Sequence, residues 1–141
     1  MFTQFFEELN IKTNEQKLIK ITDKIKQFVN HSGISSGILN VSILHTSASL
    51  LIQENADDDV QRDLLNFYDK LVPMDNDIYI HNTEGKDDMP AHIKSSLTNS
   101  NLTLSIKNNK LVLGVWQGIY LFEHRIEKQL RKIFLHILGE K

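Results

Sequence analysis

The chain has 141 residues, of which 40% are hydrophobic and 24% charged, which is the composition of a globular protein and excludes a disordered chain. Its 16 basic and 18 acidic residues leave a formal net charge of -2, which excludes broad electrostatic attraction to nucleic acid or to an anionic membrane surface. Cysteine is absent, and this excludes disulfides, thiolate metal sites and thiol nucleophiles.

Two strands and a helix are predicted at the start of the chain. Residues 1–11 are rich in Phe and Ile without helical spacing, and residues 17–21 form a second short run. Thr22 suits a helix N-cap, and Gly33 suits a helix end. Between them the apolar residues that share one face are Ile25, Phe28 and Val29. We therefore expect a short amphipathic helix after two strands.

A buried strand and a second helix follow. Residues 38–46 include β-branched or apolar side chains at both odd and even positions, which is typical of a strand covered on both faces. Residues 50–53 are expected to continue that strand or to pair with it. Residues 57–59 are three acids, which suit the positive end of a helix. The apolar positions that follow recur with helical spacing: Val60, Leu64, Phe67 and Leu71.

The last part of the chain predicts a long loop, a short helix and a set of strands. Residues 74–89 are polar, and we expect a surface loop around a short strand at 78–80. Asp88 is expected to cap a third helix, with Pro90 in its first turn. After that helix apolar residues alternate with polar ones, which predicts antiparallel strands around Leu102–Ile106, Leu111–Leu113, Ile119–Leu121 and Ile133–Ile137.

No boundary divides the chain. It contains neither a linker nor a repeat, its first residues lack the pattern of a secretory signal, and no apolar run approaches the roughly 18 residues of a membrane span. We expect a single domain over residues 1–141, located in the cytoplasm, with neither nucleic acid nor membrane as a partner.

Three of the six histidines are candidates for a metal site. His45 ends an apolar strand, whereas His81 and His92 flank the acidic loop. The positive end of the third helix would hold His92 neutral, with a lone pair available to a metal. Three imidazoles suit zinc and leave a fourth position for water or substrate. Two of the other histidines have ordinary explanations, His31 at a helix end and His136 on a strand face.

Several carboxylates lie near these histidines in the sequence and could orient the rings: Glu54, Glu84, Asp87 and Asp88. Their alternative interpretation is a solvated face or a helix cap. Glu54 follows His45 by an odd number of residues, so one uninterrupted strand would place the two on opposite faces. A bend near Ser47 or Ser49 is required if both are to reach one pocket.

The strand that ends at Arg125 carries a second group of charges. Alternation places Leu121, Glu123 and Arg125 on one face. Glu123 and Arg125 form a structural ion pair in one interpretation. In the other, Arg125 offers its guanidinium to a phosphate or carboxylate, with Lys94 as the second anion contact.

Three runs of the sequence resemble the YjbQ family, a numbered family of uncharacterised proteins. They are residues 45–50 (HTSASL, followed by Glu54 and Asn55), residues 84–96 (EGKDDMPAHIKSS) and residues 114–125 (GVWQGIYLFEHR). Their order and length make the resemblance far more specific than any single histidine, and it extends over almost the whole chain.

The resemblance implies an α+β fold, a β-sandwich with two or three helices that assembles as a homotrimer through its sheets. It also implies a polar pocket that holds a divalent metal or an anion. Carried over by position, the metal ligands are His45, His81 and His92, and the catalytic polar residues are Glu54, Asp88 and Glu123. Arg125 and Lys94 would bind the anion.

Members of the family are often described as secondary thiamine-phosphate synthases, which join a pyrimidine diphosphate to a thiazole phosphate and release pyrophosphate. The first hypothesis is therefore an enzyme acting on a small phosphorylated molecule, with zinc as the expected metal and magnesium as the alternative for a diphosphate. The second hypothesis is a metal- or ligand-binding trimer without turnover. The sequence departs from the family pattern after Arg125, where Glu127 to Leu130 replace glycines before Arg131.

Overall fold

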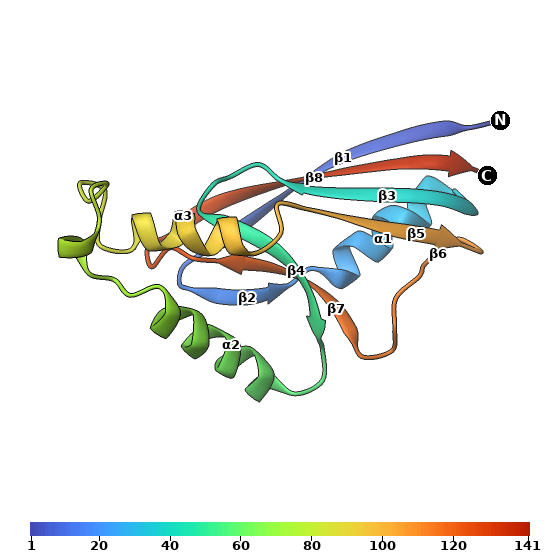
Figure 1. Ribbon diagram of the computed structural model, residues 1–141. Helices are drawn as coiled ribbons and strands as arrows, with labels where there is room; N and C mark the ends of the chain where they lie inside the picture. Colours follow the sequence, from blue (N-terminus) through green and yellow to red (C-terminus); the bar gives the residue numbers. More distant parts are fainter.

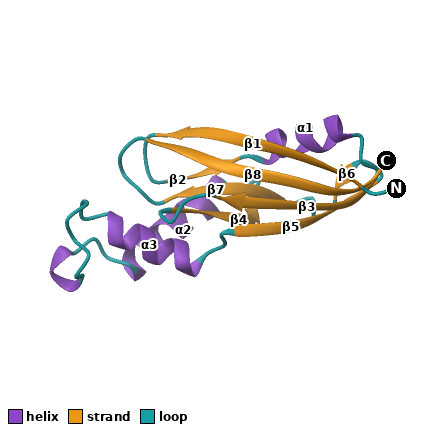
Figure 2. Ribbon diagram, turned by 90° about the horizontal axis from the view of Figure 1, so that it is seen from above, coloured by secondary structure: helices purple, strands orange, loops and turns teal.

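The computed structural model describes residues 1–141 and consists of two stacked antiparallel sheets with three α-helices (Figures 1 and 2). The larger sheet contains, in spatial order, β1 (Thr3–Thr13), β8 (Gln129–Glu140), β3 (Ser36–Ile43), β5 (Asn101–Lys107) and β6 (Lys110–Leu111). The smaller sheet contains β2 (Lys17–Lys20), β7 (Gln117–Glu123) and β4 (Ala48–Glu54). The expected α+β sandwich is confirmed.

Short connections between consecutive strands carry the chain from one sheet to the other, and residues 112–116 do so between β6 and β7. Residues 14–16 join β1 to β2, residues 44–47 join β3 to β4, and residues 124–128 join β7 to β8. The bend expected near Ser47 is therefore present. Residues 50–53 neither extend β3 within its sheet nor pair with it, because after the bend β4 pairs with β7.

The core lies between the two sheets because their facing residues are apolar at every second position. Strand β8 shows the pattern, with Ile133, Leu135 and Ile137 buried and their neighbours more exposed. Nineteen buried residues form this cluster. Helix α1 (Thr22–Ser32) adds Ile25 and Val29 to it.

Helix α1 ends as predicted and begins differently. Gly33 has a φ of +69°, the left-handed conformation that glycine adopts without a steric penalty. Thr22 is the first helical residue and Ile21 is the N-cap, so the prediction of a Thr22 cap is wrong. The Thr22 hydroxyl instead accepts a hydrogen bond from the backbone N–H of Ile119 at 2.9 Å.

The other two helices lie outside the sandwich. Helix α2 (Asp58–Leu71) is capped by Asp57 and packs Leu64, Leu65 and Tyr68 against the outer face of the smaller sheet. Helix α3 (Asp88–Leu97) lies beside β4. Figure 1 shows the loop between α2 and α3 at the end of the molecule away from both termini.

Two predictions for the loop and α3 are wrong. Residues 78–80 form no strand, since the loop contains only the short 3-10 helix η1 (Asn76–Ile78). The N-cap of α3 is Asp87 rather than Asp88, which is the first helical residue. His92 consequently lies one turn after Asp88, not in the first turn.

The outer face of the larger sheet is uncovered in the single chain. Phe6, Ile38 and Leu138 are 58%, 52% and 46% exposed. In the register of the sheet Ile38 pairs with Leu138, and Phe6 stacks on the ring of His136. The expectation that β3 is covered on both faces is therefore wrong within one chain. No helix of the structure combines the length and apolar character needed to cross a membrane.

Candidate functional site

His81, Asp88 and His92 form one cluster at the N-terminal end of α3. One nitrogen or oxygen of each residue lies within 4.8 Å of the corresponding atoms of the other two. The Oδ2 atom of Asp88 is 2.7 Å from Nε2 of His81 and 3.1 Å from Nε2 of His92. Asp88 and His92 share a face because they are four residues apart on a helix, and His81 reaches them from the loop.

The hydrogen bond of Nδ1 in His92 determines whether Nε2 carries a proton in the neutral ring. Nδ1 of His92 is 2.9 Å from the carbonyl oxygen of Thr46, and a carbonyl can only accept, so Nδ1 carries the proton. In the neutral ring Nε2 therefore presents a lone pair, and it faces the carboxylate oxygen of Asp88. Two acceptors at 3.1 Å attract one another only when a proton or a cation lies between them.

Electrostatics favours the ionised form of Asp88. Burial works to raise the pKa of Asp88, but the hydrogen bond that it accepts from His81 and the charge of Arg125 contribute to holding it below its ordinary value. The same hydrogen bond, which His81 donates to Asp88, raises the pKa of His81. The cluster therefore offers an anionic oxygen to any cation that binds there.

Arg125 stabilises the cluster through hydrogen bonds to Asp88 and to the residues just before α3. Its guanidinium donates to Oδ1 of Asp88 at 2.6 Å, to Oδ2 of Asp87 at 3.0 Å and to the carbonyl oxygen of Glu84 at 3.0 Å. Gly85 follows with a φ of +104°, a conformation that only glycine adopts freely, and a Cβ there would meet Asp87 at 3.0 Å. Arg125 therefore orients Asp88, and it uses three of its five N–H donors inside the protein.

Glu123 pairs with a different arginine from the expected one. The carboxylate is fully buried and accepts hydrogen bonds from Nε of Arg131 at 2.7 Å, from Nη2 of Arg131 at 2.5 Å and from the hydroxyl of Thr13 at 2.5 Å. Arg125 gives it only a backbone N–H. The predicted Glu123–Arg125 ion pair is therefore wrong, and the burial of Glu123 gives it a structural role within this chain.

Lys94 is also engaged inside the protein. It is only 3% exposed, and its Nζ donates to Oδ1 of Asp69 on α2 at 2.6 Å. This ion pair ties α3 to α2 and leaves no free ammonium at the surface. The expected use of Lys94 as an anion contact does not fit this geometry.

His45 lies outside the cluster and lines an adjoining groove. Its Nε2 accepts the backbone N–H of Lys132 at 2.8 Å, so in the neutral ring the proton is on Nδ1 and no lone pair is free for a metal. Burial, followed by the charge of Arg131, lowers the pKa of His45 and keeps the ring neutral. The residue that lies with His81 and His92 is therefore Asp88 and not His45.

The groove has a volume of about 370 Å³ and is lined only by polar residues. They come from the bend before β4, from α3 and from the residues that follow α3: His45, Thr46, His92, Ser95, Ser96, Thr98 and Ser100. His92 belongs to both the cluster and the groove, so the two form one continuous site.

Glu54 lies elsewhere in this chain. It stands at the far end of β4, six residues from Ala48, which is roughly 20 Å along a strand. Its carboxylate accepts the backbone N–H groups of Ala56 and Asp57 just before α2. Within one subunit the structure does not bring Glu54 to the cluster, and the helix-cap interpretation describes its contacts.

The sequence did not single out a buried chain of polar groups beneath the groove. Nε2 of His124 is 2.8 Å from the Ser49 hydroxyl, which is 2.6 Å from the hydroxyl of Thr98. Burial, followed by the charges of Lys94 and Arg131, lowers the pKa of His124 to about 3. One feature of the sequence could have revealed this chain, because alternation places His124 on the same face as the buried Tyr120 and Phe122.

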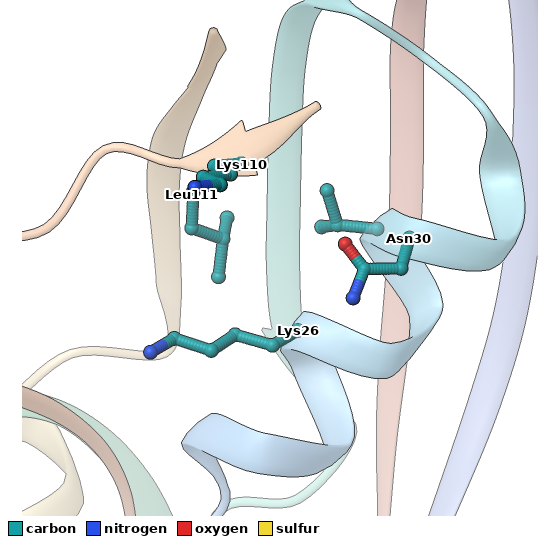
Figure 3. A pocket seen from close by; sticks show the side chains of 5 residues that line it. Lys26, Asn30, Lys110 and Leu111 are labelled. Carbon is teal, nitrogen blue, oxygen red and sulfur yellow. The ribbon is translucent and has the colours of Figure 1, made fainter. Parts of the chain in front are cut away.

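A second hollow lies between α1 and β6, at the end of the molecule that carries the termini (Figure 3). It has a volume of about 340 Å³ and is lined by Lys26, Val29, Asn30, Lys110 and Leu111. It contains neither a histidine nor a carboxylate, so the cluster and its groove remain the candidate site.

Comparison with known proteins agrees with this fold. The sequence profile described as UPF0047 protein YjbQ-like matches residues 7–140. A UPF0047 protein of Synechocystis is 48% identical over 139 residues, which cover 99% of this chain and 95% of the relative.

Two crystal structures share the fold. A YbjQ-like protein of unknown function from Sulfolobus solfataricus has a TM-score of 0.92 and 26% identity, covering 99% of this chain and 100% of that chain. An uncharacterised conserved protein of the YjbQ/UPF0047 family from Clostridium acetobutylicum has a TM-score of 0.84 and 44% identity, covering 93% of this chain and 98% of that chain.

Proposed function

This chain belongs to the UPF0047 YjbQ-like family, and from that premise we propose that it is a metal-binding protein whose metal is held by His81, Asp88 and His92. The observation that carries the proposal is the contact between Nε2 of His92 and Oδ2 of Asp88. The Thr46 carbonyl turns the lone pair of His92 toward a carboxylate, as expected of a ligand oriented by its second nitrogen.

The donor set fits zinc better than magnesium. Two imidazole nitrogens and one carboxylate are typical zinc ligands, whereas magnesium prefers oxygen ligands and retains several waters. A metal bound by three side chains would keep a position open toward the groove that shares His92. Arg125 would orient Asp88 through its hydrogen bond to the second carboxylate oxygen.

We propose thiamine-phosphate synthesis from a pyrimidine diphosphate and a thiazole phosphate as the reaction. The support is the family membership together with the arrangement of charge. Because Arg125 and Lys94 are already paired with carboxylates, a diphosphate would find its positive charge in the bound metal. The groove hydroxyls and His45 would hold the uncharged part of the substrate.

Zinc binding tests the proposed ligand set. Protein purified without a histidine tag should bind one zinc per chain in calorimetric titration, and His92→Ala should weaken the affinity by about 100-fold or more. His31→Ala is the matched control, because His31 is an exposed histidine at the end of α1. Equal zinc affinity in His92→Ala and wild type would rule out the ligand set.

Pyrophosphate release tests the reaction. The zinc-loaded protein should release pyrophosphate from the two thiamine precursors, and the His92→Ala, Asp88→Asn double variant should not. Activity that persists unchanged in the double variant would belong to a contaminant.

A second candidate is a metal-binding protein without turnover. The observation that favours it is the engagement of Lys94 and Arg125 in internal ion pairs, which leaves the groove without a free cationic side chain. Stoichiometric zinc binding without pyrophosphate release would select this candidate.

We also propose that the chain assembles as a homotrimer through the uncovered face of the larger sheet. The support is the apolar patch of Phe6, Ile38, Phe134 and Leu138 on that face. Light scattering should give three times 16.3 kDa, and Ile38→Asp should give monomers. A wild-type monomer would contradict the proposal.

A further inference from the structure

The hydroxyl groups along α3 direct their protons away from the groove. Ser95 donates to the carbonyl oxygen of Ala48 at 3.2 Å, and Ser96 donates to that of Ile93 at 2.7 Å. A hydroxyl has a single proton and two lone pairs, so a proton directed inward leaves a lone pair outward. This wall of the groove therefore presents acceptors.

Thr98 is the most strongly constrained of these groups. Its Oγ1 lies 2.8 Å from the Lys94 carbonyl oxygen and 2.6 Å from the Ser49 hydroxyl. Ser49 is fully buried and bonded in turn to His124, which is 1% exposed. For either tautomer of His124, the Thr98 proton goes to Ser49 or to the Lys94 carbonyl, and both lie inward.

Turning the hydroxyl proton of Thr98 toward the groove would break a buried chain of hydrogen bonds. Nδ1 of His124 already has no partner, so the only polar contact of this ring is the one to Ser49. Loss of a partner by a buried polar group costs more than the hydrogen bond itself contributes. Thr98 therefore faces the groove as an acceptor only.

From this we infer that Thr98 is a specificity-determining residue that accepts a hydrogen bond from an uncharged amino group of the substrate. The lining of the groove contains no carboxylate, so a neutral amino group on a heterocycle fits it better than a cation does. The inference rests on the proposed function, because it concerns the part of the substrate that carries no phosphate.

The test compares 4-aminopyrimidine with 4-methylpyrimidine, which has a similar shape without the donor. Amide chemical shifts of the full-length protein give the dissociation constants and show whether groove residues are the ones affected. We expect the amino compound to bind about 5- to 10-fold more tightly. Thr98→Val, which keeps the branched shape, should reduce this ratio to about one, as expected when a single acceptor is lost. Thr103→Val should leave it unchanged, because Thr103 is an exposed threonine of β5 that does not line the groove.

Equal affinities in wild type, absence of shifts at groove amides, or a ratio that survives Thr98→Val would each overturn the inference. Zinc titration of the same samples separates it from the proposed function. Intact zinc binding with no preference for the amino compound rejects the role of Thr98 alone. A preference that persists in protein unable to bind zinc rejects the metal site alone.

Discussion

Replacing Arg131 with Met tests the account of the buried charges. Arg131 is 2% exposed and bonds Glu123 through two nitrogens, so Arg131→Met keeps the length of the side chain but removes its charge. Glu123 would remain fully buried, retaining only the hydroxyl of Thr13 and the backbone N–H of Arg125. An uncompensated buried carboxylate is strongly destabilising.

The magnitude follows from the contacts that are lost. Each hydrogen bond to a charged group contributes about 1.5–3 kcal/mol, and the two remaining donors still offset part of the loss. We therefore expect the free energy of unfolding to fall by about 3–5 kcal/mol, the usual cost of breaking a buried pair. The Glu123→Gln, Arg131→Met double variant should recover much of this loss, because it contains no unpaired charge.

The variant should also affect the site. Nη2 of Arg131 donates to the carbonyl oxygen and hydroxyl of Ser47, next to the Thr46 carbonyl that orients His92. Zinc affinity should therefore decrease together with stability, even though Arg131 contacts none of the three proposed ligands.

Urea unfolding at a fixed protein concentration measures the stability, since any oligomer makes the result depend on concentration. The control is Arg62→Met, because Arg62 and its partner Asp59 are both 73% exposed, and this surface pair should contribute less than about 1 kcal/mol. If Arg131→Met loses no more than Arg62→Met, the reasoning about the buried pair is refuted.

Three further predictions concern other parts of the structure. The folded-state pKa of His124 is about 3, below the ordinary 6.5, so its contribution to stability is present above pH 6.5 and lost as the pH falls toward 3. The loss should reach about 2–3 kcal/mol near pH 4.5, and His124→Phe should show a shallower dependence in acid unfolding than wild type does; parallel curves would contradict the assignment. Gly139→Ala should destabilise the larger sheet by about 2 kcal/mol or more in urea unfolding, because its Cβ would collide with the carbonyl oxygen of Ser36, and unchanged stability would disprove that close approach. Arg125→Met should lower zinc affinity about 10- to 100-fold by calorimetry, since it removes the group that orients Asp88, and an affinity equal to that of wild type would exclude this role.

Local patterns predicted most of the fold. Alternation located the strands of the last third, and the spacing of Val60, Leu64, Phe67 and Leu71 located α2, because both patterns depend on which side of an element is buried. The same patterns could not distinguish a core from an open sheet face. Ile38 is apolar like Leu39, and nothing in the order of residues states that only Leu39 is covered within the chain.

The site was predicted in part. The structure brings the expected His81 and His92 together, but the third member of the cluster is Asp88 and not the expected His45. Whether a histidine has a free lone pair depends on the partner of its second nitrogen, and His45 differs from His92 only through the N–H of Lys132 and the carbonyl of Thr46. These backbone partners come from distant positions that spacing does not specify.

The same argument applies to the charged residues. Glu123 and Arg125 share a strand face in the sequence pattern, yet Glu123 pairs with Arg131, which lies on the other sheet just after the bend of residues 124–128. Lys94 is paired by Asp69, which is 25 residues away on another helix. Pairing of charges is a property of the packed chain, so the sequence left these alternatives open.

Diffraction at the zinc absorption edge, from crystals of zinc-loaded protein without a histidine tag, tests the central claim most directly. The account predicts one anomalous peak per chain, about 2.1 Å from Nε2 of His81, from a carboxylate oxygen of Asp88 and from Nε2 of His92. A loaded crystal with no peak there, or with its only peak at another histidine such as His45, would contradict it.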